Sequence, residues 1–199
     1  MSKLIKDYIQ NKHIWITGAS SGIGLALAEQ CLKLGAKVAV TSRRTDPYEP
    51  LIKQWPELIV ATADLTETDQ VKQAVQTIKN KLKTIDIAIL NAGTCEYMHG
   101  REFRSDIFEH LMKANFFSMV YCIEAILPLL KESKAPHLAT MGSLSAYAGL
   151  PTAAAYGASK AAVMNMSQSL QIDWISSGIM VSNVSPGFVD TPLTRKNTF

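Results

Sequence analysis

The sequence predicts an α/β protein whose doubly wound parallel sheet lies between two layers of helices. Three observations predict it: six short apolar runs, helical patterns between these runs, and a glycine-rich turn directly after the first run. The runs are mostly apolar throughout rather than alternating, which is typical of strands buried on both faces. Repeated strand–helix units join parallel strands by right-handed crossovers. We therefore expect three layers (α/β/α) and the strand order 3-2-1-4-5-6.

The expected elements alternate along the chain. Residues 13–17 form the first strand, and the helix after it covers 22–34 and ends at Gly35, because glycine is favoured directly after a helix. The other expected strands cover residues 37–42, 58–62, 86–90, 137–141 and 179–184. The other expected long helices cover about 66–82, 106–130 and 153–177. Pro47 and Pro50 allow only a short helix between the second and third strands.

Composition favours one soluble globular domain over residues 1–199. Hydrophobic residues make up 47% and charged residues 19% of the 199 residues, a balance typical of a folded core rather than of disorder. The net charge of +3 gives no support for nucleic acid or an anionic membrane as a partner. We expect no membrane span, since no unbroken apolar run is long enough, and the charged N-terminus does not resemble a secretory signal.

The cysteines and histidines indicate neither a disulfide scaffold nor a metal site. Cys31, Cys95 and Cys122 are odd in number and far apart, and no CxxC or HExxH spacing occurs. We therefore expect no metal and a reducing, cytoplasmic environment.

The turn after the first strand has the pattern of a phosphate-binding loop. Thr17 is followed by a GxxxGxG segment that leads into a helix. Glycines permit close approach of a ligand to the backbone, and the N–H groups and dipole of a helix N-terminus favour a pyrophosphate. The expected dinucleotide contacts here are Gly18, Ser20, Ser21, Gly22, Ile23 and Gly24. The alternative is a tight turn that only packs.

The end of the second strand favours NADP over NAD. Ser42 is followed by Arg43 and Arg44, and no acidic residue occurs before Asp46. An acid at this point accepts hydrogen bonds from the NAD ribose, whereas arginine accommodates the 2′-phosphate of NADP. We expect Arg43 to matter more than Arg44. The alternatives are that these are ordinary surface arginines, or that the cofactor is NAD.

Tyr156 and Lys160 form a candidate acid–base pair on the last long helix. Their i, i+4 spacing places them on one helix face. A nearby ammonium would lower the pKa of the phenol and let it exchange a proton with a substrate oxygen. Ser143 follows the fifth strand, at the sheet edge where open α/β sheets bind ligands. Taken alone, such a pair is more often a packing contact with a solvated lysine.

Together these motifs resemble the short-chain dehydrogenase/reductase family, which has a Rossmann fold. The resemblance runs from residue 17 to residue 191 and rests on TGASSGIG (17–24), Asp64-Leu65, Asn91-Ala92-Gly93, Asn115, Ser143, Tyr156, Lys160, Pro186-Gly187 and Thr191. It implies an NADP(H)-dependent oxidoreductase that acts on a ketone or secondary alcohol. The alternative is a non-catalytic dinucleotide-binding sensor or scaffold, because a fold does not fix a function.

The resemblance also implies roles for single residues. Tyr156 would be the general acid/base, Lys160 would hold the nicotinamide ribose, and Ser143 would orient the substrate oxygen, ahead of the nearby Ser145. Asn115 would hold a water that links Lys160 to solvent, or would simply be a polar residue satisfied within its helix. The implied adenosine contacts are Asp64, Leu65, Asn91, Ala92 and Gly93. The implied nicotinamide contacts are Pro186, Gly187, Val189 and Thr191. Asp64 has an alternative role as an acidic residue at a helix N-terminus.

Two further expectations follow from the resemblance. The family usually continues past this chain's last residues, with a substrate-binding loop and a seventh strand, so we expect both to be absent here. The residues expected near a substrate are then Cys95, Tyr97, Leu144, Ala146, Leu150 and Phe188. The alternative is that they are ordinary loop and core residues. The family also commonly forms dimers or tetramers through its two long helices, and small residues at 152–155, Ala158, Ala161 and Ala162 permit close helix approach, so a homodimer or homotetramer is expected. The alternative is close packing of this helix on its own sheet.

Overall fold

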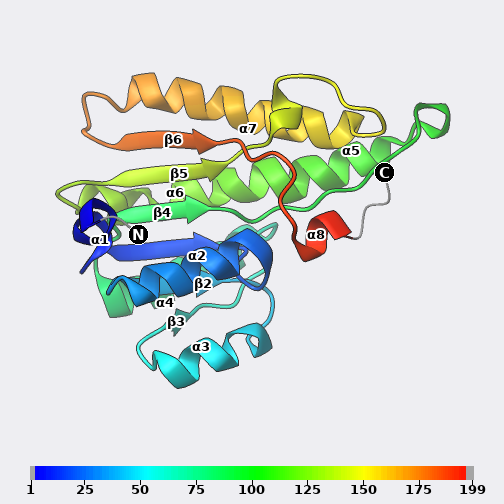
Figure 1. The fold of residues 1–199 in the computed structure, drawn as a ribbon. Helices are drawn as coiled ribbons and strands as arrows, with labels where there is room; N and C mark the ends of the chain where they lie inside the picture. Colours follow the sequence, from blue (N-terminus) through cyan, green and yellow to red (C-terminus); the bar gives the residue numbers. More distant parts are fainter. Residues whose placement is uncertain (1–2, 196–199) are drawn as a thin grey trace.

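The computed structural model describes residues 3–195, and its centre is a six-stranded parallel sheet (Figure 1). The strand order is β3-β2-β1-β4-β5-β6, which confirms the predicted topology. The strands are β1 (His13–Thr17), β2 (Lys37–Thr41), β3 (Ile59–Val60), β4 (Ile87–Leu90), β5 (His137–Met141) and β6 (Met180–Val184). All of them end at the same edge, on the right in Figure 1.

Helices cover both faces of the sheet. They are α1 (Lys3–Ile9), α2 (Gly22–Lys33), α3 (Glu49–Gln54), α4 (Thr68–Leu82), α5 (Ser105–Met112), α6 (Ser118–Lys131), α7 (Ala154–Asp173) and α8 (Pro192–Arg195). The cores show the layering: α4, α6 and α7 share one core with one face of the sheet, and α2 and α3 share a second core with the other face. Consecutive strand residues therefore point into different cores, as Trp15 and Ile16 do.

The expected helix over 106–130 contains a π-helical segment. Residues Lys113–Phe117 form this segment between α5 and α6, and Asn115 within it has no exposed surface. A π turn adds a residue to the helical turn and is often found at functional sites. The sequence pattern did not predict the interruption, because the apolar periodicity continues through it.

The same stretch bears on the expectation of no membrane span. Among residues 3–195, the helix Ser105–Lys131 is long and apolar enough in composition to cross a membrane, and 44% of its most apolar window is buried inside the protein. The packing of α6 explains this composition, since Ile123, Ile126 and Leu130 lie in the core against the sheet.

Two short helices, α1 and α8, were not expected from the pattern. The helix α1 buries no residue, and α8 has only four residues, so neither has a strong apolar stripe. The helix α3 is short, as predicted; Pro50 lies in its first turn, where a missing N–H costs no helical hydrogen bond. Helix α7 ends at Asp173 instead of residue 177, and turns lead from there into β6.

Candidate active site

A groove with a volume of about 880 Å³ runs along the carboxyl edge of the sheet. It gathers residues from the loops that follow all six strands, far apart in the sequence. The predicted site residues that line it are Gly18, Ser20, Ser21, Gly22, Ile23, Arg43, Arg44, Asp64, Leu65, Asn91, Ala92, Gly93, Ser143, Tyr156, Lys160, Pro186, Gly187, Val189 and Thr191. Gly24 and Asn115 do not line the groove; they contact residues that do, Asn91 and Thr94 respectively.

The glycine loop is held by close backbone packing. Gly18 has a φ of +64°, and a Cβ atom there would lie 2.6 Å from the Cα of Ala92. A Cβ atom on Gly24 would lie 2.6 Å from the Asn91 amide nitrogen. Asn91 donates from that nitrogen to the backbone oxygens of Thr17 and Gly18, at 3.1 Å each. The loop and the β4 turn are therefore one rigid unit.

Replacing Gly18 should disrupt this unit. In Gly18→Ala the methyl group meets backbone that cannot move aside, and the left-handed φ adds strain of about 1–2 kcal/mol. We expect the free energy of unfolding to fall by about 2 kcal/mol or more and dinucleotide affinity to fall at least about tenfold. Chemical denaturation and cofactor titration measure these effects. Gly100→Ala is the control, because a Cβ atom there meets nothing within 4 Å. Equal behaviour of the two variants would contradict the packing argument.

The end of the groove beside β2 is cationic. The hydrogen bond that the Thr66 backbone N–H donates to the Asp64 carboxyl lowers its pKa most, and the charges of Arg43 and Lys113 lower it further. That bond is 2.9 Å, and the Thr66 hydroxyl donates to the same oxygen. Asp64 thus fixes a turn that precedes α4 rather than lying in the helix's first turn. Arg44 pairs with Asp46 at 3.4 Å.

Tyr156 and Ser143 meet at the opposite end of the groove. Burial raises the pKa of the Tyr156 phenol, and its hydrogen bond with Ser143 acts in the lowering direction. The Ser143 hydroxyl also accepts a 2.9 Å hydrogen bond from the Ser145 hydroxyl. Ser145, the rival in the sequence, is buried and acts as a partner of Ser143.

Lys160 lies beneath Tyr156 and is almost fully buried. Its side chain donates a 2.9 Å hydrogen bond to the Met141 carbonyl, and Nζ is 5.9 Å from the Tyr156 ring centroid. Burial lowers the pKa of Lys160 to about 8. The pKa of Tyr156 is therefore not lowered as expected: burial of the phenol raises it, and the lowering contribution comes from Ser143.

Asn115 supports the site from behind. Its side-chain oxygen accepts the Thr94 N–H at 2.7 Å, and its amide nitrogen donates to the Thr94 carbonyl and to the Ser159 hydroxyl. A Cβ atom on Gly93 would lie 3.0 Å from Asn115 Oδ1 and 3.4 Å from Lys160 Nζ. Asn115 thus joins the loop after β4 to α7 close to Lys160, and its amide hydrogens are already used.

Several groove residues were not predicted. One set lies at or after the ends of strands: Thr41, Ala63, Thr94 and Gly142. Their position at the carboxyl edge of the sheet could have been predicted from the sequence. A second set, His110, Lys113, Ala114 and Ser118, comes from α5, the π segment and the start of α6. Helical spacing places this second set on one face, but the pattern alone did not show that the face borders the groove.

Comparison with known proteins identifies the family. Residues 12–198 match the short chain dehydrogenase family. The chain belongs to the short-chain dehydrogenases. An uncharacterised oxidoreductase of Staphylococcus saprophyticus is 32% identical over 191 residues, which cover 94% of this chain and 82% of that protein.

Solved structures agree with this assignment. The aldohexose dehydrogenase of Thermoplasma acidophilum has a TM-score of 0.86 and 28% identity, covering 95% of this chain and 71% of its own. A dehydrogenase/reductase of Sinorhizobium meliloti has a TM-score of 0.88 and 26% identity, covering 96% and 79%. This short-chain dehydrogenase is an oxidoreductase of a family that binds NAD(P) and acts on small molecules.

The groove fits such a dinucleotide. Ser20 to Ile23 line it at the start of the twelve-residue helix α2, where the Ser21 side chain makes no capping hydrogen bond and no acidic residue lies in the first turn. The backbone N–H groups there are suited to an anion. Thr191 lies against the glycine loop, since a Cβ atom on Gly22 would be 3.3 Å from its side chain. The segment after β6 thus folds back beside α2 (Figure 1).

Proposed function

We propose that this short-chain dehydrogenase is an NADP(H)-dependent oxidoreductase that interconverts a ketone and a secondary alcohol. One observation carries the proposal: Ser143, Tyr156 and Lys160 line the same groove as the glycine loop. A substrate oxygen at Ser143 and Tyr156 would then be next to the nicotinamide end of a dinucleotide that starts at Arg43. The test is consumption of NADPH by a panel of ketones, followed by the nicotinamide absorbance.

The three side chains have distinct tasks in this mechanism. The bound nicotinamide supplies or accepts the hydride. Ser143 donates a hydrogen bond to the substrate oxygen and holds it against Tyr156. Tyr156 gives its phenolic proton to that oxygen in reduction and takes a proton from it in oxidation. Since burial raises the pKa of Tyr156, the phenol is protonated at neutral pH and ready to donate.

Lys160 and Asn115 complete the proposed proton path. Lys160 would hold the nicotinamide ribose and replace the proton that Tyr156 gives up. Its pKa of about 8 suits a group that exchanges a proton near neutral pH. Asn115 is a positioning residue: it fixes the loop at Thr94, and a water that links Lys160 to solvent is proposed to lie beside it.

The preference for NADP is proposed to reside in Arg43. Its guanidinium lies at the groove close to Asp64, whereas Arg44 is paired with Asp46. In Arg43→Ala we expect the Kd for NADPH to rise about 10- to 100-fold, as the loss of a charge-assisted phosphate contact implies, and the Kd for NADH to change little. Fluorescence titration of both cofactors measures this.

Arg44→Ala is the matched control for that titration. Because its guanidinium is exposed and paired with Asp46, its loss should weaken NADPH binding less than the loss of Arg43. An equal rise in the Kd values for NADH and NADPH in Arg43→Ala would contradict the assignment of Arg43 to the 2′-phosphate.

The remaining proposals concern the assembly. We infer that residues 1–199 act as one dinucleotide-binding and catalytic unit in a reducing compartment such as the cytoplasm, with free Cys31, Cys95 and Cys122. We also infer a homodimer or homotetramer through the helices α5–α6 and α7, which lie side by side on one face (Figure 1). Phe117, 43% exposed, is suited to such a contact. Light scattering of the wild type and Phe117→Glu tests this assembly.

A further inference from the structure

The substrate end of the groove carries very little charge. The sixteen residues from Met141 to Tyr156 include Ser143 and the loop that leads into α7, and they contain no Asp, Glu, Lys, Arg or His. The segment from Pro186 to Val189, which lies against them, is also free of charged residues. A hydrogen bond of 3.2 Å from the Leu144 N–H to the Pro186 carbonyl joins the two segments.

Large apolar side chains are exposed on these two segments and on α8. We call them the apolar rim: Leu144, Tyr147, Leu150, Phe188, Val189 and Leu193. Leu144 is 55% exposed and directly follows Ser143, and its Cδ1 atom lies 3.4 Å from the place of a Cβ atom on Gly187. Phe188 is 74% exposed, and Val189 and Leu193 line the groove itself. The rim therefore borders the proposed position of the reacting oxygen.

Three cationic side chains near this end are already hydrogen-bonded within the protein. Arg195 donates to both carboxylate oxygens of Asp190, at 2.6 and 2.8 Å. Arg104 forms a bidentate ion pair with Asp106 at the start of α5. Lys160 is buried beneath Tyr156 and its amine is bonded to the Met141 carbonyl. These cations are thus committed to partners within the protein.

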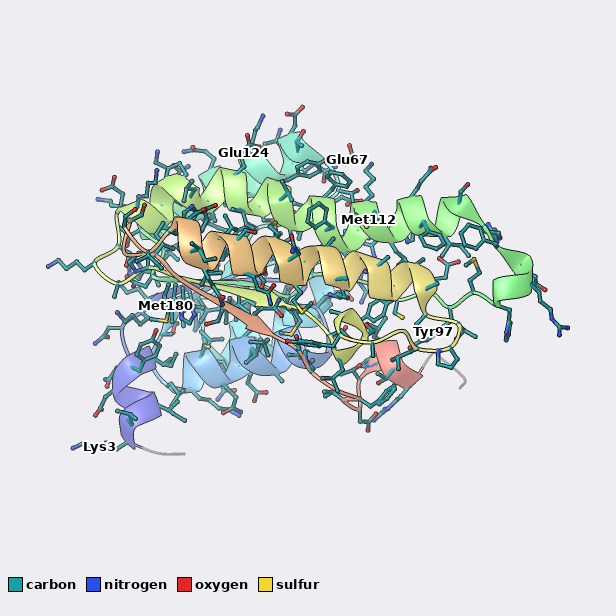
Figure 2. All side chains as sticks on the ribbon, turned by 90° about the horizontal axis from the view of Figure 1, so that it is seen from above. Lys3, Glu67, Tyr97, Met112, Glu124 and Met180 are labelled. Atoms are coloured by element: carbon teal, nitrogen blue, oxygen red, sulfur yellow. The ribbon has the colours of Figure 1, made fainter. Side chains whose placement is uncertain are left out.

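The loop after β4 places Cys95 and Tyr97 near the Tyr156–Lys160 pair, with the acidic Glu96 between them. Cys95 and Tyr97 form a hydrogen bond with each other, and both interact electrostatically with the Tyr156–Lys160 pair. Figure 2 shows Tyr97 at the same end of the molecule as α8, far from Met180 and Lys3. Burial raises the pKa of the Cys95 thiol and raises that of Tyr97 to about 12, so both are uncharged at neutral pH.

The two ends of the groove thus differ in charge and polarity. Arg43 lines the adenosine end together with Arg44 and Lys113, which are exposed and paired with Asp46 and Glu67, and phosphate charge has to be met there. The substrate end offers apolar surface, one thiol and hydroxyl groups. An anionic group placed there would lose water without gaining a cation, which is costly, whereas apolar atoms gain free energy on leaving water.

We propose that the substrate is a neutral ketone or secondary alcohol whose body beyond the reacting carbon is apolar and packs on the rim. Ketones that carry a carboxylate or phosphate on that body are poor substrates. This inference rests on the proposed function, since it takes Ser143 and Tyr156 as the position of the reacting oxygen.

A matched pair of ketones tests the inference. With NADPH saturating, 4-methylcyclohexanone and 4-oxocyclohexanecarboxylate present the same ring and differ in one substituent. We expect kcat/KM to be at least about tenfold higher for the methyl compound, because its substituent is buried without an unpaired charge. Equal values, or a preference for the carboxylate, would overturn the inference.

A cation introduced into the rim should shift the preference. In Leu144→Lys an ammonium next to Ser143 can meet the carboxylate, so we expect the ratio of the two kcat/KM values to move at least about fivefold toward the acid. Ile172→Lys is the control: the side chain is 71% exposed on α7, about 24 Å along the helix from Tyr156. An equal shift in both variants would contradict a local effect of the rim.

Binding separates this inference from the proposed function. Calorimetry with the Tyr156→Phe protein and NADPH measures the affinity for each ketone without turnover. Tighter binding of the methyl compound supports the apolar rim even if the wild type reduces neither ketone, in which case the proposed reaction is what fails. Tighter or equal binding of the carboxylate overturns the inference whatever the turnover.

Discussion

Tyr156→Phe should lower kcat by about a hundredfold to ten-thousandfold, the range that general acid–base catalysis contributes. The change removes only the phenolic oxygen. The aromatic ring keeps its packing against a small core that includes Leu111 and Ala155, so the fold and the groove should persist. We expect the Kd for NADPH to stay within about twofold of the wild-type value, because phosphate and adenosine contacts dominate it. Single-turnover kinetics and cofactor titration measure the two effects.

Tyr147→Phe is the matched control for this variant. Tyr147 is 64% exposed in the segment that precedes α7, and the proposed mechanism gives its hydroxyl no proton to move. Near-normal kcat in Tyr156→Phe, or an equal loss in both variants, would contradict the acid–base assignment. In the wild type the reduction rate should also fall as pH rises through the raised pKa of Tyr156, because only the protonated phenol donates.

Lys160→Met should abolish most turnover and also change how stability depends on pH. Burial lowers the pKa of Lys160 from 10.5 to about 8 in the folded chain. Between these pH values the unfolded chain keeps a proton that the folded chain has lost, so wild-type stability rises with pH there. Relative to Lys160→Met, the wild type should gain about 3 kcal/mol as pH rises through this window.

Denaturation of both proteins between pH 7 and pH 11 measures that difference. Subtracting the two curves removes the titration of every group that the proteins share. Parallel curves would mean that the folded state does not disfavour the Lys160 ammonium, and Lys160 would then be no reserve of protons near neutral pH. A rise of about 3 kcal/mol in the wild-type free energy of unfolding relative to that of Lys160→Met, together with loss of turnover in the variant, supports the burial argument.

Most of the fold could be predicted from the sequence, for physical reasons that are local. Strands such as 137–141 are apolar because both faces of a parallel sheet are covered, and Gly35 marks the end of α2 because it adopts a positive φ of +83°. The groove was predictable for a topological reason: parallel strands all end at one edge, so Gly18, Ser143 and Pro186 had to meet there.

The features that escaped prediction depend on tertiary packing. The π segment leaves the apolar periodicity intact, and the bonds from Asn115 to Thr94 and Ser159 join elements that no spacing rule connects. The direction of the Tyr156 pKa shift was also missed. Spacing indicates that Lys160 is near, but only the structure shows how deeply both groups are buried, and burial raises the pKa of the phenol.

Isotope transfer tests the central claim most directly. The protein is incubated with 4-methylcyclohexanone and NADPH that carries deuterium at both positions of the nicotinamide C4, and the products are analysed by mass spectrometry. The account predicts one deuterium on the carbinol carbon of the alcohol, formed at a rate that Tyr156→Phe lowers at least about a hundredfold. Tight binding of NADPH with no deuterium in any product, across this ketone and a wider panel, would contradict it and favour a dinucleotide-binding sensor.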